Sequence, residues 1–182
     1  MSIESFDLDA SPPNWYEVAK ALQAQASILQ ESRSAIIRFT DKQGNVRSRF
    51  EANRGVFLLA GFSIENLLKA FLIYEDPNLI GGGQIARKIR THALSKLWEM
   101  SSYVPYKKRY MATVAALEEG LESWARYPCG LTHERSAIEG VMTDELWSKY
   151  LSLFSSCSKR LEGLLSKGWT DHNGTSFHMT YE

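Results

Sequence analysis

An arginine and a histidine separated by six residues, Arg126 and His133, are the side chains of this sequence best suited to chemistry. The imidazole of histidine gains and loses a proton near neutral pH, whereas the arginine guanidinium is a permanent, fork-shaped cation. Together they can transfer a proton and stabilise negative charge that develops on a substrate. A structural alternative stays open, in which Arg126 caps the C-terminus of a helix and His133 is a surface loop residue.

A second group of polar residues lies near or within the most apolar stretch of the chain. Glu65 and Lys69 are four residues apart, a spacing and order that favour an intrahelical ion pair, and a buried carboxylate would need such a partner. Glu65 could equally orient Arg126 or His133, although structural pairing is the favoured interpretation. His92 begins a short amphipathic segment, and we expect it to cap or pack that segment rather than to act as a second catalytic histidine.

Charge is unevenly distributed along the chain. The 21 basic and 21 acidic residues cancel, so the net charge argues neither for nor against a polyanionic partner. Residues 84–109 nevertheless carry seven basic side chains against one acidic side chain. Such runs are usually solvated helix faces. The functional alternative is an edge that attracts phosphates, with Trp98, Tyr103 and Tyr106 near enough to stack on bases. The candidate phosphate-binding residues are Arg87, Lys88, Arg90, Lys107, Lys108 and Arg109.

Apolar periodicity predicts the helices that would position these residues. Pro12 and Pro13 open an amphipathic helix that ends between residues 32 and 37. A helix over about 49–74 is apolar on nearly every side, so it should lie at the centre of the fold. A short helix over 92–100, a helix opened by Pro105 and a last helix capped by Thr143 complete the set. The sequence therefore predicts an all-α fold, with four main helices and a short one in an up-down type bundle.

The length of 182 residues suits one compact domain with a sizeable core. We assign residues 1–167 to a single helical domain and residues 168–182 to a polar C-terminal tail. Residues 36–50 are a candidate small hairpin, and residues 81–83 begin a flexible loop. The predicted core places Phe57, Leu68 and Phe71 against a set of apolar residues from later helices, namely Leu117, Leu121, Trp124 and Phe154.

The order of several motifs resembles the HEPN superfamily (higher eukaryote and prokaryote nucleotide-binding domains). The central helix reads Ser63-Ile-Glu-Asn-Leu-Leu-Lys-Ala-Phe-Leu-Ile73 and a glycine-rich loop follows it. Then come Thr91-His-Ala-Leu-Ser-Lys-Leu97 and, later, Trp124-Ala-Arg-Tyr-Pro128. In this family an acidic residue and a lysine lie one helical turn apart, a His-x-Leu-x-x-Leu helix follows, and an Arg-x(4–6)-His motif comes later. The resemblance covers roughly residues 50–165.

The resemblance implies a helical bundle that dimerises side by side. Many members of the superfamily are metal-independent endoribonucleases of toxin or phage-defence type, and this activity leaves RNA with 2′,3′-cyclic phosphate ends. Arg126 and His133 would then be catalytic, and the six basic residues named above would bind RNA. The supporting residues would be Glu65, Lys69, Tyr127 and His92.

Two other interpretations stay open. The motif here is the long form, Arg-x6-His, and Tyr127 and Pro128 stand where active members commonly carry a polar residue on a helix. The chain is alternatively a degenerate, non-catalytic HEPN domain that binds a nucleotide, an RNA or a partner protein. The other interpretation is that the chain is a helical interaction module that is only accidentally similar to the family.

The remaining features favour a cytoplasmic protein without a cofactor. Cys129 and Cys157 are far apart and lack a Cys-x-x-Cys partner, so we expect free thiols and no metal site. The acidic N-terminus lacks the layout of a signal peptide, and the longest apolar run contains Glu65, Asn66 and Lys69, which a membrane span would exclude. The expected partners are a second copy of the chain, RNA and an antitoxin or other protein.

Overall fold

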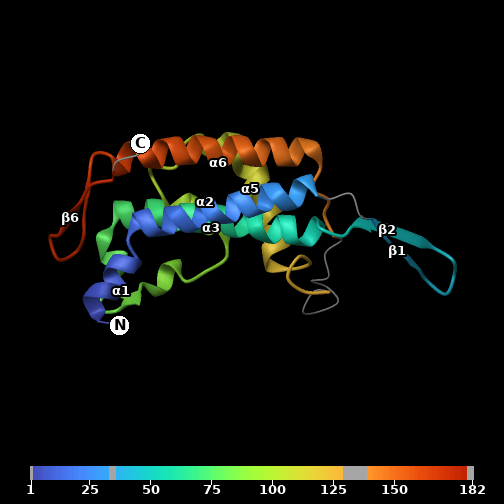
Figure 1. The fold of residues 1–182 in the computed structure, drawn as a ribbon, viewed down its shortest axis with the longest axis horizontal. Coiled ribbons are helices and arrows are strands. Elements are labelled where there is room, and N and C mark those ends of the chain that lie inside the picture. Colours follow the sequence, from blue (N-terminus) through green and yellow to red (C-terminus); the bar gives the residue numbers. More distant parts are fainter. Residues whose placement is uncertain (1, 33–35, 129–138, 180–182) are drawn as a thin grey trace.

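The computed structural model describes residues 2–32, 36–128 and 139–179, and this part of the chain is mostly helical (Figure 1). The helices are α1 (Ile3–Asp9), α2 (Pro12–Glu31), α3 (Asn53–Glu75), α4 (Leu94–Met100), α5 (Lys107–Glu122) and α6 (Asp144–Leu165). Two-stranded antiparallel hairpins pair β1 (Ile36–Thr40) with β2 (Val46–Phe50), β3 (Ile80–Gly81) with β4 (Gln84–Ile85), and β5 (Trp169–Thr170) with β6 (Ser176–Phe177). The predicted mostly helical class is confirmed.

Helix α3 is the centre of the fold, as its all-round apolar sequence predicts. It packs against α2, α4, α5 and α6. Its apolar window is long enough to cross a membrane, but 78% of that window is buried inside the protein, as in the core helix of a soluble protein. Phe57 contacts Trp124 edge to face, with ring centroids 4.5 Å apart. The predicted core residues are all buried: Phe57, Leu68, Phe71, Leu117, Leu121, Trp124 and Phe154.

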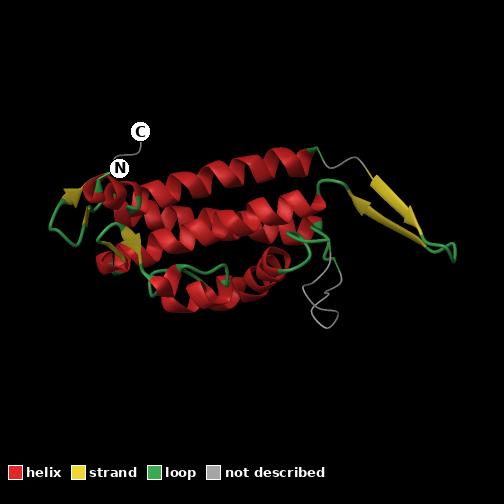
Figure 2. Ribbon diagram, turned by 90° about the horizontal axis from the view of Figure 1, so that it is seen from below, coloured by secondary structure: helices red, strands yellow, loops and turns green. Residues whose placement is uncertain are grey.

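The β1–β2 hairpin connects α2 to α3 and projects beyond the end of the helices (Figures 1 and 2). Its register pairs Ile36 with Phe50 and Thr40 with Val46. The turn is fixed by Asp41, whose carboxylate accepts hydrogen bonds from the backbone N–H groups of residues 43 and 45, each at 2.9 Å. The hairpin suggested by the sequence is therefore present, and it lies outside the helical core.

Three elements differ from the sequence-based expectations, and each is short. Helix α1 has seven residues, too few for apolar periodicity to reveal it. Residues 81–83 belong to the β3–β4 hairpin, in which Gly82 and Gly83 take φ values of 60° and 73° that favour glycine in the turn. The expected polar tail contains the β5–β6 hairpin, whose Trp169 is only 5% exposed and donates its indole N–H to the Ile73 carbonyl.

Two helical glycines differ in the space around them and give a matched test of core packing. A Cβ on Gly120 would lie 2.8 Å from Phe57 Cδ1, whereas a Cβ on Gly163 would meet nothing within 4 Å. We expect Gly120→Ala to lower the free energy of unfolding by about 1–3 kcal/mol, because the core is overpacked. Gly163→Ala should raise it by up to about 1 kcal/mol through helix propensity. Urea unfolding of both variants measures the difference, and equal shifts would contradict this packing.

Burial raises the pKa of the Cys157 thiol to about 12, against an unperturbed value of 9.0. The thiol therefore ionises in the unfolded chain at a lower pH than in the folded protein. Its contribution to stability is complete below pH 9 and is lost as the pH rises from 9 toward 12, by about 1.4 kcal/mol per pH unit. Urea unfolding of wild type and Cys157→Ala between pH 8 and 10.5 measures this. The stability advantage of wild type should shrink above pH 9, and a pH-independent difference would argue against a buried thiol.

Candidate functional site

A buried carboxylate on α3 holds two basic side chains. Glu65 is 4% exposed, and its Oε1 accepts a hydrogen bond from Lys69 Nζ at 2.7 Å, one turn along the same helix. Its Oε2 lies 2.8 Å from His92 Nδ1, which the segment before α4 contributes. Lys69 is 7% exposed, so this ion pair is taken almost completely out of water. The expected i,i+4 pair is present, and a histidine distant in sequence joins it.

His92 does not cap α4, in contrast to one of the roles expected for it. Thr91 Oγ1 accepts the hydrogen bond of the Ala93 N–H, and the Glu118 carboxylate accepts that of Ser95 in the first turn of the helix. The His92 ring instead packs edge-on against Phe62 of α3, with centroids 5.8 Å apart and planes at 75°. Its packing on Phe62 agrees with the other expected role, and its bond to Glu65 was not expected.

The solvent exposure of His92 is the feature of this site most relevant to chemistry. The His92 side chain is 48% exposed, although the carboxylate that holds it is 5% exposed. Its second ring nitrogen, Nε2, makes no hydrogen bond to any residue that the structure describes. One nitrogen of His92 is therefore held by Glu65, and the other has no hydrogen-bond partner among the described residues.

Arg126 lies against the same aromatic ring as His92. Its guanidinium carbon is 5.7 Å from the centroid of the Phe62 ring, in a cation–π arrangement. Phe62 precedes Glu65 by about one helical turn on α3, so both groups lie near one stretch of this helix. Of the residues proposed from the sequence, the structure brings together Glu65, Lys69, His92 and Arg126. His133 lies outside the described residues.

Lys69 is enclosed from the side of α2. Its ammonium lies 5.3 Å from the centroid of the Trp15 ring, and Trp15 is itself held by a hydrogen bond from its indole N–H to the Ala10 carbonyl at 2.9 Å. This contact places an aromatic face against a buried cation, a favourable electrostatic arrangement. Trp15 and Phe62 were missed as site residues because their spacing in sequence only indicates helix faces.

The first turn of α3 anchors the chain on both sides of residues 129–138. Arg54 Nη1 donates to the Tyr127 carbonyl at 2.7 Å, and its Nη2 lies 2.9 Å from Glu139 Oε2. Asn53 donates to the Gly140 carbonyl at 2.8 Å. Tyr127, expected to support catalysis, thus contributes a backbone carbonyl to an anchor. No sequence pattern indicates the roles of Asn53 and Arg54, because these roles depend on tertiary contacts.

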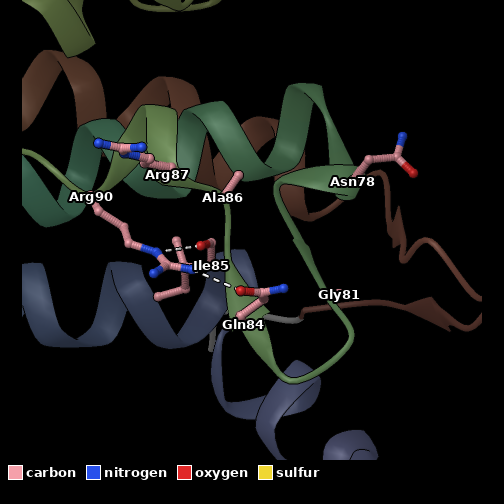
Figure 3. A pocket seen from close by; sticks show the side chains of 7 residues that line it. All are labelled: Asn78, Gly81, Gln84, Ile85, Ala86, Arg87 and Arg90. Atoms are coloured by element: carbon pink, nitrogen blue, oxygen red, sulfur yellow. Dashed lines mark hydrogen bonds between the residues drawn. The ribbon is translucent and has the colours of Figure 1, made fainter.

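The candidate phosphate-binding residues come from two segments of the chain. Arg87, Lys88 and Arg90 directly precede His92, and Figure 3 shows Arg90 bent toward the β3–β4 hairpin, where it donates to Gln84 and to the Ile85 carbonyl. Lys88 lies 3.3 Å from Asp76. Arg87 and Arg90 line an open pocket of about 390 Å³, together with Asn78, Gly81, Gln84, Ile85 and Ala86.

The second basic group, Lys107, Lys108 and Arg109, begins α5. Glu118 of this helix contacts the start of α4, which follows His92. Eleven residues separate Lys107 from Glu118, a rise of about 16 Å along the helix. The second group is therefore well removed from the contact at Glu118. Lys107 Nζ instead donates to the Glu99 carbonyl of α4 at 3.0 Å.

Comparisons with known proteins and a search for metal ligands add no further residues to the site. The chain matches no family model, no curated protein and no solved structure. Within residues 2–32, 36–128 and 139–179 no three His, Cys, Asp or Glu side chains are grouped to hold a metal ion. The arrangement around Glu65 is therefore the feature from which a function can be inferred.

Two Glu–Lys pairs with the same i,i+4 spacing differ in burial and test how much the site contributes to stability. Glu65–Lys69 is buried, whereas Glu145–Lys149, at 2.6 Å, has side chains 78% and 58% exposed. We expect Glu65→Ala to lower the free energy of unfolding by about 3–5 kcal/mol, because it leaves the Lys69 ammonium buried without its partner. Glu145→Ala should change it little, since solvent screens that pair. Similar losses in urea unfolding would contradict the buried pair.

Proposed function

We propose that this protein is a HEPN-like up-down helical bundle that cleaves RNA without a metal ion and leaves 2′,3′-cyclic phosphate ends. The observation that carries the proposal is that His92 and Arg126 both contact the ring of Phe62, and that His92 also bonds the buried Glu65. Intramolecular cleavage of RNA needs a group that takes the 2′-hydroxyl proton and a cation that stabilises the charge on the phosphoryl oxygens. An imidazole and a guanidinium meet these two needs.

The surroundings of the site also suit a polyanion. Three basic residues precede His92 within five positions, and Arg87 and Arg90 both line the neighbouring pocket. Cationic side chains at an exposed edge bind phosphates independently of sequence and release counterions on binding. RNA binding by this protein should therefore weaken steeply as the salt concentration rises.

The proposed assembly is a cytoplasmic homodimer, with an antitoxin or other protein as a further partner. Large apolar side chains remain exposed on outer faces of α2 and α6, among them Val18 (48%), Ile28 (60%) and Leu151 (37%). Such side chains are available to be covered by a second copy. Dimerisation would bring two sites into one molecule, as the resemblance implies.

One observation favours the non-catalytic alternative. Helix α5 ends at Glu122, and Arg126 and Tyr127 lie in turns beyond it, whereas active members of the superfamily commonly run this motif on a helix. The anchoring of the Tyr127 carbonyl by Arg54 holds that conformation. A domain that binds RNA without cutting it is the second candidate function.

The proposal predicts cleavage of structured RNA by the pure protein in EDTA, with 2′,3′-cyclic phosphate ends that can be mapped. Arg126→Ala should reduce the rate by about 10²–10³-fold, because it removes charge stabilisation that exists only during the reaction. Arg160→Ala is the matched control, since Arg160 also lies 5.7 Å from an aromatic ring, that of Tyr103, away from this site. It should cleave like wild type.

The outcomes separate the two candidate functions. If wild type, Arg126→Ala and Arg160→Ala bind RNA alike and none of them cuts it, the protein is a binding domain. If chelation alone abolishes cleavage, the metal-independent reaction is wrong. His133→Ala, at a residue outside the described part of the chain, tests the role that the resemblance implies for it, and it should also abolish cleavage.

A further inference from the structure

We infer that His92 is a catalytic residue that takes the proton of the substrate hydroxyl at Nε2, and that Glu65 is the positioning residue that makes this nitrogen a base. The inference rests on the proposed function and assigns a role that the sequence alone did not favour. It depends on three features of the described residues: the tautomer that Glu65 imposes, the access to Nε2, and the charges around the ring.

The carboxylate determines which nitrogen of His92 carries the proton. An ionised carboxylate only accepts hydrogen bonds, and the ammonium of Lys69 at 2.7 Å supplies the charge that a buried Glu65 needs. The contact of 2.8 Å between Oε2 and Nδ1 therefore has Nδ1–H as its donor. In the neutral ring the second nitrogen, Nε2, is then left with a lone pair, which is the form of histidine that accepts a proton.

A second histidine shows why access matters. His172 also pairs with a buried carboxylate, since its Nε2 lies 3.5 Å from Asp7 Oδ2 and Asp7 is 5% exposed. Its side chain is 19% exposed, and its other nitrogen, Nδ1, is buried without a hydrogen-bond partner among the described residues. Both pairs join a histidine to a buried carboxylate, but the His92 side chain is 48% exposed, so its ring is the more accessible of the two.

The charged groups around His92 come from α3, from α5 and from the segment beyond α5. Glu65 and Lys69 of α3 form a pair whose charges offset one another, so the histidine does not face an unbalanced anion. Glu118 of α5 is occupied by the Ser95 N–H at the start of α4. Arg126, beyond α5, shares Phe62 with His92 and can stabilise an anion held in front of the ring.

The reaction conserves its atoms and protons. His92 Nε2 takes the proton of an RNA 2′-hydroxyl as the 2′-oxygen forms a bond to the adjacent phosphorus. The bond from phosphorus to the 5′-oxygen breaks, and that oxygen takes a proton from water. The products are a 2′,3′-cyclic phosphate and a 5′-hydroxyl, and the imidazolium returns its proton to solvent. Arg126 stabilises the charge on the non-bridging phosphoryl oxygens while these bonds change.

The test compares His92→Gln with His172→Gln in the cleavage of a structured RNA in EDTA. We expect His92→Gln to lower the rate constant by about 10²–10⁴-fold without changing the affinity for RNA, because proton transfer is lost. His172→Gln is the matched control, because the His172 ring also pairs with a carboxylate but is mostly buried. This variant should cleave like wild type. Glu65→Gln should lower kcat and leave KM unchanged, since an amide no longer specifies the tautomer.

Chemical rescue distinguishes proton transfer from a structural role. His92→Gly opens a space at an exposed position, and added imidazole should restore part of the cleavage, whereas it should not accelerate Arg126→Ala. If wild type cuts RNA and His92→Gln cuts equally well, or if imidazole fails to rescue a folded His92→Gly, the role of His92 is overturned while the proposed function stands. If wild type cuts no RNA, the proposed function and the role of His92 both fall.

Discussion

The carboxylate of Glu65 lies inside the protein on its central helix, and a buried charge is tolerated only where other groups replace the water it has lost. Lys69 provides the opposite charge, and His92 provides a hydrogen bond to the other oxygen. Removal of either partner would leave an oxygen of the carboxylate without compensation. The positions of α3 and of the segment before α4 are thus coupled through one side chain.

The elements between α3 and α4 bring His92 to this carboxylate. The turn at Gly82 and Gly83 reverses the chain, and the Ala86 N–H donates to the Leu79 carbonyl at 2.7 Å. Ile89 is fully buried and holds the following segment against the bundle. His92 is therefore placed by an ordered connection, and its orientation is set before any substrate arrives, which is the arrangement that favours catalysis.

The sequence predicts what depends on local patterning. The apolar periodicity of α3, the Thr143 cap of α6, whose hydroxyl accepts from the Leu146 N–H, and the Glu65–Lys69 pair are all determined within one or two helical turns. The pair between Glu65 and His92 joins residues 27 apart, and no periodic pattern encodes that contact. For the same reason no sequence pattern places Trp15 and Phe62 beside this site. The β3–β4 and β5–β6 hairpins escaped prediction because strands of two residues carry no alternation to detect.

Nitrogen NMR of the imidazole rings in 15N-labelled protein shows whether the buried Glu65 fixes the tautomer of His92. At a pH where His92 is neutral, we expect a proton on Nδ1 and a lone pair on Nε2. Glu65→Gln should bring the ring to a mixture of tautomers. A neutral His92 that carries its proton on Nε2 in the wild-type protein would overturn the role given to Glu65, because that nitrogen could not then accept a proton from a substrate.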